Sequence, residues 1–127
     1  MNKRNVKVTM STGTAEDFFK RAHEDAKKLD RGEMLAPEIR ITFEDPADML
    51  RALTVERVRV LKIVRQKRTT LSSLAATLKR DRKSVCRDVA LLESLNLLRT
   101  RTETNPGHGV VKVVEPVAQK YHLTATV

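Results

Sequence analysis

The chain has few of the residues that build disulfide frameworks or aromatic cores. Its 127 residues include one cysteine, one tyrosine, three phenylalanines and no tryptophan, so aromatic side chains make up 3% of the sequence. A single cysteine excludes an intrachain disulfide and fits a reducing compartment. The scarcity of aromatics argues against a protein that stacks the bases of RNA. Because the sequence has no run of 18 apolar residues and no signal-peptide pattern, we expect a cytoplasmic protein without a membrane span.

The patterns that carry catalytic chemistry are also missing. His23, His108 and His122 lie far apart, and none has a second ligand three or four residues away, as a zinc site requires. No glycine-rich phosphate loop, nucleophile elbow or pair of catalytic carboxylates is present. A redox-sensing Cys86 would need a lowered pKa and a partner thiol, so we interpret this residue as a small, half-buried filler. The sequence therefore predicts a protein that is not an enzyme and that holds no metal ion and no cofactor.

Positive charge is plentiful and unevenly distributed. The chain carries 25 Lys and Arg against 16 Asp and Glu, a formal net charge of +9. Residues 1–45 hold nine basic and nine acidic side chains, whereas residues 46–127 hold sixteen basic and seven acidic ones. The entire excess thus lies in the second part. Such segregation is expected of a surface that binds a polyanion and unexpected of an ordinary solvated surface.

The basic part contains an amphipathic helix that is predicted to run from Arg82 to about Leu95. Its core side is apolar at helical spacing, at Val85, Val89 and Leu92. Its opposite side carries two long cations and then two small residues, at Lys83, Arg87, Ala90 and Ser94. Small residues let a backbone approach a surface closely, and the cations reach phosphates or base edges. Asp81 is a suitable N-cap, since its carboxylate can accept from the first amides of the helix.

The neighbouring segments complete a recognisable layout. A shorter helix from about Ser72 to Lys79 comes first, and Arg80-Asp81 is the short connection of a helix-turn-helix. After the long helix, residues 98–103 and 110–115 read as two strands around a turn. Residues 69–71 are a candidate third strand. A helix pair followed by a basic β-hairpin is the layout of a winged helix.

The segment LSSLAATLKRDRKSVCRDVALLESLNLLRTR resembles the winged helix-turn-helix transcriptional regulators of bacteria and archaea, of the MarR and ArsR type. The matching pattern is L-x-x-L-A-x-x-L, a short turn and S-V-x-R-D-V-x-x-L-x-x-L-x-L-L, and the resemblance covers residues 54–116. It implies an α+β fold with a three-helix core and a β-hairpin wing. Members of this group often have glycine where the second helix ends, but Lys79 or Arg80 stands there here. Because a left-handed conformation costs a non-glycine residue about 1–2 kcal/mol, we expect the turn to be closed differently.

The resemblance and the exposed cations together predict sequence-specific binding to double-stranded DNA. Helix 82–95 would enter the major groove, and hairpin 98–115 would lie along the backbone or in the minor groove. The residues expected to contact bases are Lys83, Ser84 and Arg87, with Arg87 the best candidate to pair with a guanine edge. The residues expected to contact phosphates are Ser72, Ser73, Arg80, Arg82, Arg99, Arg101 and Lys112.

Residues 1–45 are predicted to form a β-α-β extension ahead of the DNA-binding domain, which would occupy residues 46–127. Residues 5–10 and 39–43 alternate as strands, and Thr14 caps a helix that ends near Arg31. This helix carries one apolar stripe, at Phe18, Ala22, Ala26 and Leu29, with Phe19 beside it. Residues 121–127 alternate as a terminal strand that could pair with the first one.

Two strands and one helix bury little surface by themselves. The extension therefore either packs onto the DNA-binding domain or meets a second copy of the chain, and we expect a homodimer. The alternative function is an antitoxin-like protein that neutralises a partner toxin through this extension and that could also bind its own operator. RNA binding is a weaker third possibility.

Overall fold

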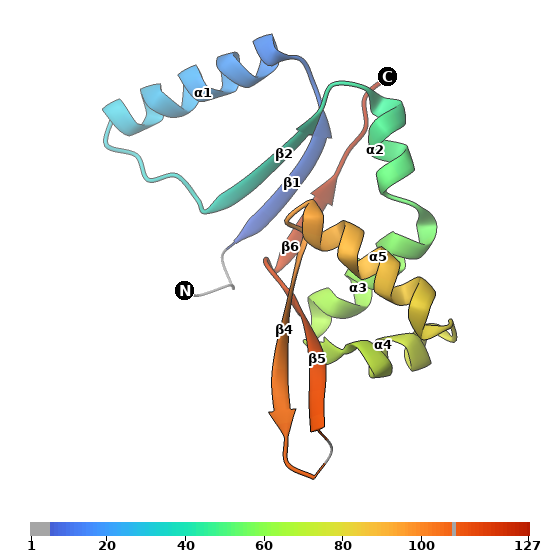
Figure 1. Cartoon of the computed structure of the whole chain (residues 1–127). Coiled ribbons are helices and arrows are strands. Elements are labelled where there is room, and N and C mark those ends of the chain that lie inside the picture. The colour runs from blue at the N-terminus through green and yellow to red at the C-terminus, as the bar shows by residue number, and fades with distance from the viewer. Residues whose placement is uncertain (1–5, 108) are drawn as a thin grey trace.

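The structure is a computed structural model that describes residues 6–107 and 109–127 (Figure 1). Within these residues, six strands and five helices follow one another as β1 (Lys7–Thr12), α1 (Ala15–Asp30), β2 (Glu38–Phe43), α2 (Pro46–Ala52), α3 (Val55–Gln66), β3 (Thr69–Thr70), α4 (Leu71–Leu78), α5 (Arg82–Ser94), β4 (Leu98–Asn105), β5 (Gly109–Pro116) and β6 (Lys120–Leu123). Helices and strands are mixed, as the sequence predicts. His108, which the sequence places in the hairpin turn, lies outside the described residues.

β1 is the central strand of a parallel three-stranded sheet with the order β2-β1-β6. Val8 pairs with Ile39 of β2 and with Tyr121 of β6, so alternate residues of the three strands point to the same face. On β1 this face carries Val6, Val8 and Met10, each at most 3% exposed. The predicted pairing of the C-terminal strand with the N-terminal one is confirmed. The sheet is therefore built from both ends of the chain.

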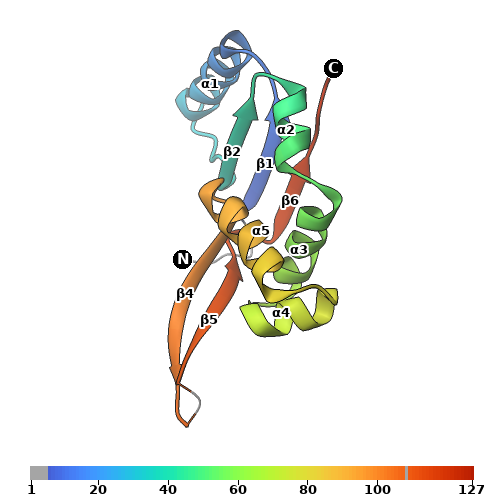
Figure 2. The same ribbon diagram turned by 45° about the vertical axis from the view of Figure 1, so that its right-hand side comes forward.

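α1 crosses the opposite face of this sheet (Figures 1 and 2). This face is polar, with Thr9, Ser11 and His122 among its side chains. Thr14 begins the helix with the predicted cap, and Asp17 completes a reciprocal capping box. An ion pair of 2.8 Å between Asp25 and Arg40 Nη1 links the helix to β2. No residue of α1 is buried. The apolar stripe of the helix therefore lies open to solvent.

α3, α4 and α5 pack around a core that is shared with the N-terminal sheet. Each helix begins with an N-cap whose side chain accepts a hydrogen bond from a first-turn amide. The three caps are Thr54, Thr70 and Asp81. One cluster of buried side chains joins the helices, the hairpin and the first sheet, including Val8, Met10, Val60, Leu74, Val85, Leu92 and Val114. Because the cluster is continuous, the N-terminal sheet and the three helices hold each other in place.

Two details of α3 and α4 differ from the sequence prediction. The apolar spacing of residues 55–66 predicts a buried Val58 and an exposed Arg57. On α3, however, Val58 is 39% exposed, Val60 takes the core position and Arg57 turns inward. At the end of α4, Lys79 adopts the left-handed conformation with φ 54°. The amides of Lys79 and Arg80 donate to the carbonyls of Ala76 and Ala75, at 3.2 and 3.1 Å, which is the Schellman arrangement. The expectation of a differently closed turn is therefore wrong, because two capping hydrogen bonds offset the strain of a lysine there.

The hairpin of β4 and β5 forms a second, antiparallel sheet with the short strand β3, in the order β3-β5-β4. Asn96, which follows α5, adopts the left-handed conformation with φ 62°, and Leu97 and Leu98 then turn into the core at 0% and 3% exposure. Thr100 pairs with Val114 and Thr102 with Lys112. The free end of the hairpin extends away from the rest of the molecule (Figure 1).

Candidate nucleic-acid interface

The outer face of α5 is a strip of cations and small side chains. Its exposed residues are the predicted ones, Lys83, Arg87, Ala90 and Ser94. The opposite side packs into the core, with Val85, Val89 and Leu92 at most 2% exposed. In the part of the chain that the structure describes, no ion pair engages Lys83 or Arg87, whereas most arginines elsewhere have a carboxylate partner. Both cationic groups are therefore available to an external ligand.

Ser84, the third predicted base contact, takes part in the N-terminal cap of α5. Its amide donates to Asp81 Oδ2 at 2.9 Å and its hydroxyl donates to Asp81 Oδ1 at 2.7 Å. These two hydrogen bonds, the hydroxyl one foremost, hold the pKa of the Asp81 carboxyl below its ordinary value. Because the hydroxyl proton is engaged, Ser84 can offer a base only its acceptor lone pairs.

The first turn of α4, the start of α5 and the hairpin meet around a hollow of about 250 Å³, which brings Ser72, Arg82 and Lys112 together. Ser72 is exposed at the N-terminal turn of α4, where the unpaired amides favour an anion. Ser73, in contrast, exchanges hydrogen bonds with the cap residue Thr70, its hydroxyl accepting at 3.0 Å. The hollow is therefore lined by one hydroxyl and two cations.

Arg80 lies elsewhere, in a half-buried charge cluster behind α5. Its Nη1 is 2.7 Å from Asp88 Oδ2 and 3.7 Å from Glu56 Oε2. Arg57 Nε donates to the other Asp88 oxygen at 3.1 Å, and its Nη1 donates to the carbonyls of Arg51 and Ala52 at the end of α2. Asp88 is only 8% exposed. The cluster thus joins α2, α3, the α4–α5 turn and α5, and it engages the charge of Arg80 inside the protein.

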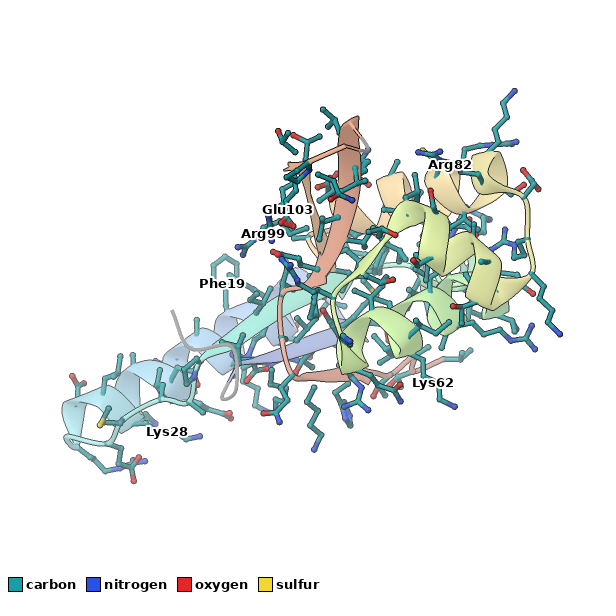
Figure 3. The ribbon with its side chains drawn as sticks, turned by 90° about the horizontal axis from the view of Figure 1, so that it is seen from below. Phe19, Lys28, Lys62, Arg82, Arg99 and Glu103 are labelled. Carbon is teal, nitrogen blue, oxygen red and sulfur yellow. The ribbon has the colours of Figure 1, made fainter. Side chains whose placement is uncertain are left out.

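The cations of the hairpin point to two different faces. Lys112 shares a face with Thr102 and Val114, and this face leads to the hollow beside α4. Arg99 and Arg101 lie on the other face, away from Arg82 (Figure 3). Arg101 is paired there with Glu115 at 2.7 Å and with Glu103 at 3.1 Å. The hairpin therefore presents Lys112 toward α4 and α5, where no carboxylate of the described residues pairs with it, and it neutralises Arg101.

The sequence prediction did not take into account the two carboxylates that neutralise Arg101, those of Glu103 and Glu115. Glu115 belongs to the strand opposite Arg99, and Glu103 is two residues after Arg101 on the same strand face. Both placements follow from the hairpin register, so a register count would have found them. Arg68, just before β3, adds a further cation at 3.4 Å from Glu103. Arg57 could not have been found in this way, because its contact with Asp88 spans 31 residues.

The described residues offer little for other chemistry. Among residues 6–107 and 109–127, no group of three His, Cys, Asp or Glu side chains is placed to hold a metal ion. Over the same residues, none of the helices combines the length and the apolar character needed to cross a membrane. Cys86 is half-buried on the flank of α5.

Two solved structures are similar to part of the chain. One is a possible transcriptional regulator from Methanosarcina mazei Go1, with 24% sequence identity and a TM-score of 0.47, and the match covers 55% of this chain and 63% of that one. The other is the homodimeric winged helix-turn-helix DNA-binding domain of a possible ArsR-family transcriptional regulator from Mycobacterium bovis, with 18% identity and a TM-score of 0.46, covering 57% and 64%. The chain therefore spans less than two thirds of each. No family model and no curated protein matches it.

Proposed function

We propose that the chain is a winged helix-turn-helix transcriptional regulator that binds double-stranded DNA in a sequence-specific manner. The observation that carries the proposal is the outer face of α5, where Lys83 and Arg87 stand unpaired among small residues on the second helix of a helix-turn-helix. A helix with this face fits the major groove of DNA, which admits one α-helix and displays a distinct pattern for each base pair.

The residues then divide into two roles. Arg87 and Lys83 are the proposed base contacts, with Arg87 pairing with a guanine edge through two parallel hydrogen bonds. Ser84 contributes as an acceptor. Ser72, Arg82 and Lys112 are the proposed phosphate contacts around the hollow, since they converge on one small region and phosphates position a protein without specifying a sequence. Arg99 is a further candidate for a phosphate contact. Arg80 and Arg101 are weaker candidates than the sequence suggested, because each already forms an ion pair with a carboxylate.

Selection of bound sequences from a random duplex library tests the proposal. The native protein should enrich a defined motif. Arg87→Ala should lose preference at one base position and weaken binding to the native motif by about 1–3 kcal/mol. Lys62→Ala is the matched control, because Lys62 is an exposed cation on α3, on a different side of the molecule from Arg82 (Figure 3), and it should leave the motif unchanged. A native protein that enriches no motif, or an Arg87→Ala variant with the native preference, would contradict the proposal.

The antitoxin-like alternative requires a surface for a partner protein, and the exposed stripe of α1 is the candidate. No feature of the described residues points to a toxin as the occupant of that surface. DNA binding and partner binding are compatible, because they use opposite ends of the molecule (Figure 1).

A further inference from the structure

The apolar stripe of α1 is large, and no residue among those that the structure describes covers it. Phe18, Phe19 and Leu29 are 60%, 68% and 56% exposed, and Ala22 and Ala26 between them are also exposed. On a helix with 100° per residue, Phe18, Ala22, Ala26 and Leu29 lie within an arc of about 80°. Contiguous apolar surface of this kind marks a contact site more often than a solvated face. We propose that this stripe is the surface through which two copies of the chain associate, with their α1 helices antiparallel.

The helix is turned so that the sheet cannot cover the stripe. Arg21 and Asp25 lie on the side of α1 that faces the sheet, where they line open hollows together with Lys7, Glu38 and Arg40. The sheet face beneath α1 is itself polar, so it has no apolar surface to offer. The apolar stripe lies around the helix axis from the side that faces the sheet, so it is open to contact with another molecule.

The order of side chain sizes along the stripe favours a second copy as the occupant. Large residues stand at both ends, Phe18 and Leu29, and small ones stand in the middle, Ala22 and Ala26. In an antiparallel pair related by a two-fold axis, Phe18 of one copy meets Leu29 of the other, and Ala22 meets Ala26. The alanines allow the helix axes to approach closely and the large residues close the two ends. The pattern is thus complementary to itself.

The nearly balanced charge of α1 also favours a second copy of the chain as the occupant of the stripe. α1 carries five acidic and four basic side chains, so two copies can meet here without repulsion, whereas their strongly basic parts repel each other. α1 also lies at the opposite end of the molecule from the hairpin tip (Figures 1 and 2). Association through α1 therefore leaves α5, the hollow and the hairpin free. The inference goes beyond DNA binding and does not depend on it.

The expected dimer is weak. α1 has 16 residues and is therefore about 24 Å long, which places a single helix pair at or below the lower end of stable interfaces, about 1,200 Å² in total. We expect a dissociation constant in the micromolar range. Because the contact is apolar, it should change little between about 50 and 200 mM salt, a range over which DNA binding weakens steeply.

Analytical ultracentrifugation of the full chain without DNA tests the inference at about 1–200 μM protein, a span that brackets weak dimers. The native chain should pass from monomer to dimer, and Phe18→Asp or Leu29→Asp should weaken the dimer at least about tenfold, since each places a charge in the contact. The milder Phe18→Ala should weaken it less. Leu50→Asp is the matched control, because Leu50 is 61% exposed on α2, and it should have no effect. Circular dichroism should show unchanged helix content in all variants.

Disulfide trapping tests the antiparallel register. In a Cys86→Ser background, a mixture of Ala22→Cys and Ala26→Cys chains should form the mixed disulfide in preference to either symmetric one. A native chain that stays monomeric throughout, a dimer that Phe18→Asp leaves intact, or symmetric disulfides in place of the mixed one would each overturn the inference. Since these experiments contain no DNA, their outcome is separate from that of the library selection.

Discussion

At the scale of single residues, Asp88 determines how much positive charge the turn before α5 presents. Its two carboxylate oxygens are held by Arg57 at 3.1 Å and by Arg80 at 2.7 Å. A guanidinium bound in this way can displace fewer counterions from DNA than a free one. Asp88 also fixes α5 against α3 and, through Arg57, against the end of α2. One carboxylate thus positions the proposed recognition helix and neutralises positive charge beside it.

Replacement of the Asp88 carboxylate should change both the stability of the fold and the salt dependence of DNA binding, and the two changes can be measured separately. Asp88→Asn removes the ion-pair partner of half-buried Arg57 and leaves Arg80 with only the more distant Glu56, at 3.7 Å, so the free energy of unfolding should fall by about 1–3 kcal/mol, a range that allows for the partial exposure of both arginines. Arg80 would be held less tightly at the same time, and the slope of log affinity against log salt should steepen by up to about 0.9. Urea denaturation and DNA titrations at several salt concentrations measure the two quantities.

Asp48→Asn is the control for Asp88→Asn. The carboxylate of Asp48 pairs with Arg51 at 2.6 Å, but both side chains are more than half exposed, so its removal should cost much less. Equal losses of stability in the two variants would show that the cluster around Asp88 does not stabilise the fold in the way we describe.

At the scale of elements, the hairpin is a two-sided ribbon whose sides differ in charge. Lys112 lies on the side that meets the start of α4 and α5. Arg101 lies on the other side with Glu103, Glu115 and Arg68. Alternation along a strand sends neighbouring residues to opposite faces. The two cations that the sequence offers as equal phosphate contacts are therefore unequal.

This difference predicts unequal salt dependence. Lys112→Ala should flatten the slope of log affinity against log salt by about 0.9, the contribution of one phosphate contact. Arg101→Ala should change it by clearly less, because Glu115 and Glu103 already neutralise that guanidinium. Neither variant should alter the selected DNA motif, since phosphate contacts carry no sequence information. A larger change for Arg101→Ala than for Lys112→Ala would mean that DNA meets the opposite side of the hairpin.

At the scale of the whole molecule, β6 closes the fold by returning the end of the chain to its beginning. Tyr121 anchors this return. Its hydroxyl donates to the carbonyl of Leu97, just after α5, at 2.8 Å, and it accepts from the amide of Val117 at 3.0 Å. One side chain thus ties the N-terminal sheet to the end of the proposed recognition helix. Burial raises the pKa of this phenol above its ordinary value.

The raised pKa sets a stability limit at alkaline pH. The unfolded chain releases the phenolic proton near pH 10, whereas the folded chain retains it to higher pH. The contribution of Tyr121 is therefore fully present below about pH 10 and is lost as the pH rises from there through the folded pKa. Since the chain has one tyrosine and no tryptophan, tyrosinate absorbance reports this group alone. Ionisation of the folded protein near pH 10 would contradict the burial of the hydroxyl.

Tyr121→Phe is the matching variant. It removes the hydroxyl but keeps the ring, so the amide of Val117 and the carbonyl of Leu97 lose a partner, and the free energy of unfolding should fall by about 1–3 kcal/mol at neutral pH. The part of the stability loss above pH 10 that comes from this phenol should disappear.

Local physical chemistry accounts for what the sequence alone determined. The helix starts at Thr14 and Asp81 were predictable because each side chain hydrogen-bonds to an amide only three residues away. The buried and exposed sides of α5 were predictable because helical periodicity separates Val85 and Val89 from Lys83 and Arg87. The order of the helix pair and the hairpin, and the presence of a strand near residue 121, followed from such local signals.

Contacts between distant segments account for what only the tertiary structure decided. Arg80 looks like a free cation in the sequence, but Asp88 neutralises it behind α5, where Arg57, 31 residues before Asp88, holds the same carboxylate. Likewise, periodicity identifies the stripe of α1 but cannot say what covers it. The sheet face beneath α1 is polar, and Phe18 and Leu29 stay exposed. Burial and ion pairing depend on which surfaces meet in space, and the spacing of residues along the chain does not encode that.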